Sequence, residues 1–280
     1  MRIEGFAAAK VNLTLHVLGR RTDGYHELDS LVAFADVGDR LWLDPGQPAG
    51  CTTTGPFARA VDGENLVEKT LRLVASKWPE ARLGHVTLEK NLPVAAGIGG
   101  GSADAAATLR ALQLANPGLG APADWQAIAK AIGADVPVCL VSRFSRMQGL
   151  GERVTELPSI APLPAVLVNP RVPLATAAVF KALAAPPLAD FDEVPVIARD
   201  AVALAASGRN DLEPVAAALQ PAIIAVRSAL LASQGCQLAR LSGSGPTCFG
   251  LFGSAAEAAA AAGLISNSNP GWWVANTTLR

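Results

Sequence analysis

The chain of 280 residues is poor in the side chains that metal and covalent sites use most, with only three histidines and four cysteines. The histidines are scattered, so a histidine-based metal site is not expected. The cysteines, at positions 51, 139, 236 and 248, form no close pair and lack the spacing of a zinc site. We therefore expect reduced thiols in a cytoplasmic protein, with residues such as Cys139 acting as small buried side chains.

An excess of charge of one sign and a long apolar run are also missing. The formal net charge of −1 argues against a nucleic-acid partner or a membrane-surface partner, although it allows a local basic pocket. The N-terminal MRIEGFAAAKVNL has no hydrophobic signal-peptide core, and no apolar segment reaches the roughly 20 residues of a membrane span. Because 50% of the residues are apolar, we expect one large or two modest packed domains.

The most informative stretch, residues 86–112, reads as a strand, a glycine loop and a helix. Alternating apolar and polar residues in VTLE predict the strand, which Pro93 stops. The loop contains Gly97, Gly99, Gly100 and Gly101. Without a Cβ atom, its backbone can approach a ligand closely. Ser102 suits a helix start, and a helix N-terminus favours an anion, so the stretch predicts a phosphate cradle, with a flexible turn as the alternative.

Two well-known phosphate loops do not match this stretch. The Walker pattern needs a lysine after its last glycine, and none follows here. The dinucleotide fingerprint needs a glycine where Ser102 stands and a clear acidic residue about 20 positions later. The predicted cradle is therefore of another kind.

Elsewhere strand and helix patterns are mixed, which predicts an α+β protein. We predict strands over 6–18, 28–43, 165–170 and 271–279, a strand on each side of a glycine turn in 237–252, and helices over 64–77, 123–132, 175–184, 214–233 and 255–265. The first strand would place Lys10 and Asn12 on one face, with Thr14 and His16. The proline-rich residues 156–164 are the expected junction between an N-terminal domain, 1–155, and a C-terminal domain, 156–280.

Several blocks, in this order along the chain, together resemble the GHMP small-molecule kinases. They are Lys10–Leu13 followed by GRRTDGYHEL (19–28), the glycine loop with GGGSADAA (93–107), GADVP (133–137) and LSGSGPT (241–247). The likeness spans nearly the whole chain. The DGYHEL block is typical of one branch, whose substrate is a cytidyl diphosphate ester of methylerythritol.

The resemblance implies a two-domain GHMP kinase fold, with an N-terminal domain like the second domain of ribosomal protein S5 and a ferredoxin-like C-terminal domain. The site would lie in the cleft between them. The implied reaction is ATP-dependent phosphorylation of the 2-hydroxyl of the cytidyl substrate, a step of the non-mevalonate isoprenoid route. Mg²⁺ is expected because it bridges phosphate oxygens. We expect a monomer or a weak homodimer.

The resemblance also implies the site residues. Asp135 would accept the hydroxyl proton, and Lys10 would keep that carboxylate ionised and orient the hydroxyl. From the residues alone, Asp135 reads as a helix-end or turn aspartate and Lys10 as a solvated lysine at a strand edge. The implied ATP-binding residues are Asn65, Pro93, Val94, Ala95, Ala96, Gly97, Ile98, Gly99, Gly100, Gly101, Ser102 and Ala103. Ser102 could bind a phosphate or Mg²⁺, or serve as a plain helix cap.

The implied substrate-binding residues are Asn12, Tyr25, His26 and Phe180. Tyr25, the single tyrosine, lies in a polar turn and would stack on cytosine. His26 would read the edge of the base, and Asn12 would bond the diphosphate or hydroxyls. Phe180 is a second stacking candidate, with a place in the core as its alternative.

Two other functions remain open. Another GHMP kinase would act on mevalonate or homoserine, but the DGYHEL block favours the cytidyl substrate. A nucleotide-binding sensor without catalysis could use the same loop, but it would need neither Lys10 nor Asp135. The expected loop Arg143–Gly149 aligns with no block of the family, and no acidic residue is assigned as a ligand of Mg²⁺.

Overall fold

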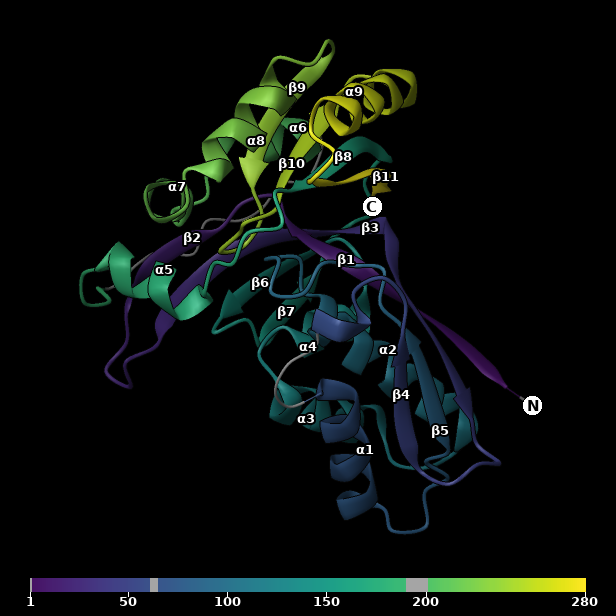
Figure 1. The fold of residues 1–280 in the computed structure, drawn as a ribbon. Helices are drawn as coiled ribbons and strands as arrows, with labels where there is room; N and C mark the ends of the chain where they lie inside the picture. The colour runs from purple at the N-terminus through teal and green to yellow at the C-terminus, as the bar shows by residue number, and fades with distance from the viewer. Residues whose placement is uncertain (1, 61–64, 190–200) are drawn as a thin grey trace. The chain divides into compact units, whose positions relative to one another are not determined.

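The computed structural model describes residues 2–60, 65–189 and 201–280, and its fold is α+β, as predicted (Figure 1). The chain forms two compact units. The first contains Met1–Ala9, Gly38–Val94 and Gly99–Ser142, and the second contains Lys10–Val37, Ala95–Ile98 and Arg143–Arg280. Strands β1 (Ile3–Asn12) and β3 (His26–Asp44) contribute residues to both units. The domain division after residue 155 stays a prediction.

The first unit packs helices beside the second half of β3. Its further elements are β4 (Gly50–Thr54), a 3₁₀ turn (Ala58–Ala60), α1 (Leu66–Lys77), β5 (His85–Glu89), α2 (Gly100–Ala115), α3 (Pro122–Ile132) and α4 (Val136–Val141). Strand β5 pairs antiparallel with β3 and parallel with β4. Helix α2 packs against both α1 and α4. Its many alanines allow this close packing on more than one side, since small side chains let helix backbones approach.

The second unit is built on antiparallel strands. Its elements are β2 (His16–Arg20), β6 (Ser145–Gly149), β7 (Arg153–Glu156), β8 (Leu163–Asn169), α5 (Thr176–Leu183), α6 (Ala201–Ser207), α7 (Glu213–Leu219), α8 (Ala222–Leu231), β9 (Cys236–Leu241), β10 (Cys248–Phe252), α9 (Ala255–Ser268) and β11 (Trp273–Leu279). Strands β11, β8, β10 and β9 lie side by side in that order. Helices α8 and α9 pack against these strands (Figure 1). The central strand β10 is therefore buried along its length.

Two predicted elements are wrong in their extent. The strand predicted over 6–18 is divided into β1 and β2. The break lies at Thr14, whose side chain and carbonyl both bond to β3. Ser30 Oγ donates to the Thr14 carbonyl at 2.5 Å, and Leu31 N donates to Thr14 Oγ1 at 3.1 Å. The helix predicted over 214–233 is α7 and α8, because Pro221 between them has no N–H to continue the helical ladder.

The remaining predicted strands and helices are confirmed where the structure describes them, with ends that shift by a few residues. Glu64, the predicted start of α1, lies outside the described residues. The loop expected over Arg143–Gly149 is wrong, because Ser145–Gly149 is strand β6. This strand pairs with β3, so that Leu28 lies opposite Gly149. Within the described ranges no helix is both long and apolar enough to cross a membrane. All four cysteines are free thiols. Cys139 and Cys248 are buried as expected, whereas Cys51 and Cys236 are only half-buried.

Candidate functional site

The glycine loop runs directly into α2, which starts at Gly100, two residues before the predicted start at Ser102. Gly99 is the N-cap residue, with φ 64° and ψ 20°, a left-handed conformation that suits glycine. Gly99 has no side chain that could cap the helix, and Ser102 lies inside the first turn. The prediction that Ser102 is a plain cap is therefore wrong. The unpaired N–H groups of the first turn are suited to an external anion.

The middle of the loop, Ala95–Ile98, is held by backbone and side-chain donors of the second unit. The carbonyls of Ala96, Gly97 and Ile98 accept hydrogen bonds from Thr247 N, Ser242 Oγ and Lys10 N, at 3.2, 3.1 and 2.9 Å. Gly97 has φ 75°, and an added Cβ would lie 2.6 Å from the Ser242 carbonyl oxygen. Only glycine fits there, so the resembled C-terminal block, 241–247, fixes this part of the loop.

The loop residues differ in exposure. Val94, Ala95 and Gly101 are exposed, and Gly97, Gly99, Gly100 and Ser102 are half-buried, whereas Pro93, Ala96, Ile98 and Ala103 are buried. A Cβ on Gly100 would point toward Lys90 Nζ, 3.6 Å away. A Cβ on Gly101 would meet, among the described residues, only Leu66, at 3.5 Å. Gly101 therefore offers the outward-facing position in the first turn of α2.

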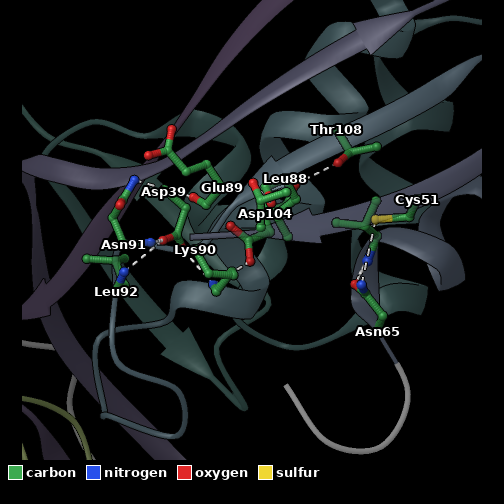
Figure 2. Close-up of polar contacts among 12 residues, drawn as sticks. Asp39, Cys51, Asn65, Leu88, Glu89, Lys90, Asn91, Leu92, Asp104 and Thr108 are labelled. Atoms are coloured by element: carbon green, nitrogen blue, oxygen red, sulfur yellow. Dashed lines mark hydrogen bonds and ion pairs between the residues drawn. The ribbon is translucent and has the colours of Figure 1, made fainter. Parts of the chain in front are cut away.

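A buried ion cluster connects the segment before the glycine loop with the helix after it (Figure 2). Lys90 follows β5, and its ammonium bonds to Asp39 on β3 and to Asp104 on α2, with 2.7 Å between Nζ and Asp104 Oδ2. All three side chains are almost fully buried. Burial lowers the pKa of Lys90, but the charges of Asp104 and Asp39 outweigh it, so the pKa lies above its ordinary value.

Asp104 is the least satisfied member of this cluster. Its Oδ1 atom is buried and has no hydrogen-bond partner among the described residues. Burial, together with the neighbouring Asp39 carboxylate, raises the pKa of the Asp104 carboxyl well above its usual value, although Lys90 opposes the shift. Two carboxyls and one ammonium share the cluster, so Asp104 is buried beside both a like and an opposite charge.

Asn65 is the N-cap residue of α1, and its side chain is occupied within the protein (Figure 2). Its Oδ1 accepts from Val67 N at 2.9 Å, and its Nδ2 donates to Cys51 Sγ at 3.7 Å. A contact from Asn65 to ATP stays a prediction.

Lys10 and Asn12 lie on one face of β1, as the alternation predicts. Lys10 Nζ donates to Asn12 Oδ1 at 2.9 Å, and Asn12 Nδ2 donates to Ser30 Oγ at 2.7 Å. Lys10 is only 3% exposed, so the alternative of a solvated strand lysine is wrong. A buried ammonium keeps its charge only with polar partners, which makes this part of β1 a polar centre within apolar surroundings.

Asp135 is the N-cap residue of α4, but its side chain makes no capping hydrogen bond. The other end of this short helix is held by Arg110 of α2, whose Nη1 donates to the Cys139 carbonyl at 2.7 Å. The same guanidinium donates from Nη2 to the Phe6 carbonyl at 2.9 Å. The position of Asp135 is therefore set by α4, which α2 and β1 hold in turn.

Tyr25 and His26 lie where the turn between β2 and β3 of the second unit leads into β3. Tyr25 is 63% exposed, so its ring is not part of the core. The His26 ring packs on Phe180, with 5.0 Å between ring centroids. Phe180 is half-buried against the hydrophobic core, which agrees in part with the core alternative. Burial, with the Arg20 charge, lowers the pKa of His26 and so favours the neutral imidazole.

Sequence reasoning missed Lys90, Asp39 and Arg110. Lys90 could have been noticed from its position, because it stands between the predicted strand and the glycine loop. Its partner Asp39 lies 51 positions away in the sequence, and nothing local marks the pairing. Arg110 reads as an ordinary helix residue, since its partners are backbone carbonyls.

Comparison with known proteins matches both halves of the chain to one family. Residues 65–143 match the GHMP kinases N terminal domain, and residues 197–266 match the GHMP kinases C terminal domain. A Cereibacter sphaeroides protein named 4-diphosphocytidyl-2-C-methyl-D-erythritol kinase is 53% identical over 281 residues, which cover 97% of each chain. The chain therefore belongs to the GHMP kinases, a family of small-molecule kinases, and this implies ATP as its co-substrate.

Solved structures agree with this assignment. The crystal structure of a 4-(cytidine 5'-diphospho)-2C-methyl-D-erythritol kinase is 36% identical, with a TM-score of 0.78 and 99% of both chains covered. The structure of a homoserine kinase from Cytophaga hutchinsonii is 19% identical, with a TM-score of 0.70. The match covers 99% of this chain and 95% of the homoserine kinase chain. The second likeness shows the GHMP kinase fold alone.

Proposed function

We propose that this kinase transfers the γ-phosphoryl group of ATP to the 2-hydroxyl of 4-diphosphocytidyl-2-C-methyl-D-erythritol, in the cytoplasm and as a step of isoprenoid precursor synthesis. The observation that carries the proposal is the relative that bears this name, 53% identical over nearly the full length. The DGYHEL block and the uncapped N-terminus of α2 support it from the sequence and the geometry. In the reaction the O2–H and bridging Pγ–O bonds break, a new O2–Pγ bond forms, and ADP leaves.

The proposed roles follow from the chemistry that this transfer needs. Phosphoryl transfer depends on positioning and charge stabilisation, so backbone N–H groups of residues 93–103 would hold the phosphates. Asp135 would accept the hydroxyl proton. The buried ammonium of Lys10, which Asn12 orients, would favour the ionised carboxylate and the developing negative charge.

Mg²⁺ would neutralise phosphate charge in this reaction. No group of three or more histidine, cysteine, aspartate or glutamate side chains that could hold a metal occurs among the described residues. This fits Mg²⁺ bound to ATP, which keeps several waters and needs few protein ligands. The half-buried Ser102 hydroxyl in the first turn of α2 is our candidate for a direct ligand.

The proposed function is tested by measuring ADP release with three acceptors: the cytidyl substrate, mevalonate and homoserine. We expect release with the cytidyl substrate and almost none with the other two. Preference for mevalonate or homoserine would assign another GHMP branch. Nucleotide binding without any ADP release would favour the sensor.

Replacing Gly101 with glutamate should weaken the binding of a non-hydrolysable ATP analogue by about tenfold or more, because like charges brought together cost several kcal/mol. The position is outward-facing and a side chain fits there. An acid in the first turn favours the helix itself, so thermal stability should not fall. Calorimetry measures the affinity. Gly101→Gln, which has the same shape without the charge, is the matched control and should lose much less affinity. Equal affinity of the glutamate variant and the wild type would contradict a phosphate site here.

Replacing Tyr25 with alanine should raise the KM for the cytidyl substrate by about 5- to 150-fold, the equivalent of a lost stacking contact of roughly 1–3 kcal/mol. The KM for ATP and the melting temperature should stay near wild type, since the ring is largely exposed. Tyr25→Phe keeps the stacking surface and should have a mild effect. If Tyr25→Ala instead weakens ATP binding, the two nucleotides have been assigned to the wrong regions.

A further inference from the structure

We propose that Lys90 and Asp104 are positioning residues for ATP: the buried ammonium ties the segment before the glycine loop to the helix after it (Figure 2). The inference rests on the proposed function, because it assumes that the first turn of α2 binds the phosphates. Neither side chain is assigned a contact with ATP.

The segment before the loop is clamped through Asp39. Its Oδ1 atom accepts from Asn91 N at 2.6 Å and from Leu92 N at 2.8 Å, while its Oδ2 atom binds Lys90 Nζ. Three donors from consecutive residues therefore meet one buried carboxylate on β3. This fixes the backbone direction immediately before Pro93, where the loop begins.

The helix after the loop is held through Asp104. Its Oδ2 atom lies 2.7 Å from Lys90 Nζ, and Asp104 stands about one turn from the helix start at Gly100. A helical turn moves as a rigid body because its backbone is hydrogen-bonded, so a tie at Asp104 fixes the direction of the N–H groups from Gly100 to Ser102. Gly99 has no side chain that could bind these N–H groups. The bond between Lys90 and Asp104 therefore orients the first turn without occupying them.

Stability alone does not account for this cluster. Burying charged groups is costly, and well-packed apolar side chains of similar volume often do as well or better. Here the cluster also has one carboxyl in excess, and Asp104 Oδ1 has no partner among the described residues. A directional bond between Lys90 and Asp104 does what an apolar contact cannot, since it sets the orientation of α2 toward the loop.

The test compares Asp104→Leu with Asp104→Asn. Leucine has a similar shape and removes the tie, yet it leaves Lys90 and Asp39 as a balanced ion pair, so the variant should fold and melt no lower than wild type. We expect its affinity for a non-hydrolysable ATP analogue to fall by about 10- to 100-fold, the scale of a small misplacement of binding groups. Asparagine keeps an oxygen acceptor for Lys90 and should bind the analogue as wild type.

A second control loosens the opposite end of the same helix. Arg82 donates to the carbonyl of Ala115, the last residue of α2. Arg82→Met should lower the melting temperature without changing the affinity for the analogue. This separates positioning of the first turn from general stability of α2.

A folded Asp104→Leu protein with wild-type affinity would overturn the inference. If Asp104→Leu and Asp104→Ala both fail to fold while Asp104→Asn is intact, the pair serves stability alone, which also overturns it. Wild-type protein without affinity for the analogue would contradict the proposed function and the inference with it. That failure is distinguishable because it needs no variant.

Discussion

Replacement of Asp135 by asparagine is expected to lower kcat by about 10²- to 10⁴-fold, the usual contribution of a general base. Asparagine cannot take a proton from the substrate hydroxyl, but it has nearly the same shape. The side chain makes no capping hydrogen bond to α4, so the substitution removes no helix cap. Steady-state kinetics measure kcat, and calorimetry should find the affinity for an ATP analogue unchanged.

A matched control for Asp135→Asn is Asp124→Asn. Asp124 lies in the first turn of α3 and pairs with Lys77 at 2.8 Å near the surface. Removing its charge should leave kcat at the wild-type value and change the stability little, as for other exposed ion pairs. If Asp135→Asn behaves like Asp124→Asn, Asp135 is a turn aspartate and another group accepts the proton.

Replacement of Lys10 by methionine is expected to lower kcat by about 10²- to 10³-fold, the range seen when one preorganised donor to developing charge is removed. Methionine has a similar length and no charge. Because Lys10 is 3% exposed, water cannot easily take the place of its ammonium. The variant also leaves Asn12 Oδ1 without its Lys10 donor, which should cost about 1–3 kcal/mol of unfolding free energy.

The exposed Lys130 on α3 provides the comparison. Lys130→Met removes the same charge from the surface and should change neither kcat nor stability appreciably. Stopped-flow or steady-state turnover, measured with thermal melting on the same samples, separates catalysis from folding. A folded Lys10→Met protein with turnover like that of Lys130→Met would exclude Lys10 from catalysis.

The strand, glycine loop and helix of residues 86–112 could be predicted because local chemistry determines them. Alternating side chains define β5, glycines allow the left-handed turn at Gly99, and alanines favour α2. The helix start was placed too late, at Ser102, because serine is a good cap. The N-cap residue is instead Gly99, which has a positive φ and no side chain that could cap the helix.

The cluster around Lys90 could not be predicted, because its members are far apart in the sequence. The ammonium joins residues 51 and 14 positions away, so the pairing depends on how β3 and α2 pack around β5. The break between β1 and β2 had the same kind of cause. The Ser30 hydroxyl and the Leu31 backbone N–H of β3 bond to Thr14, and no periodicity within residues 6–18 contains that information.

The roles proposed for Lys10 and Asp135 depended on family resemblance more than on pattern. By itself, GADVP reads as a turn, and a lone strand lysine reads as a solvated charge. The structure adds that Lys10 is buried and bonded to Asn12, which a solvated lysine would not be. It adds that α4 and Arg110 fix the backbone at Asp135.

The most direct test of the proposed reaction is phosphorus NMR of the product after incubation with ATP, Mg²⁺ and 4-diphosphocytidyl-2-C-methyl-D-erythritol. The proposal predicts one new phosphomonoester signal for each ADP formed, while the diphosphate signals of the substrate remain. A tertiary carbon bears no proton. A phosphomonoester signal without coupling to a proton on the carbon that carries the ester oxygen would therefore identify the tertiary 2-hydroxyl as the acceptor. ADP with free phosphate and no monoester, or a monoester on a primary hydroxyl, would contradict the proposal.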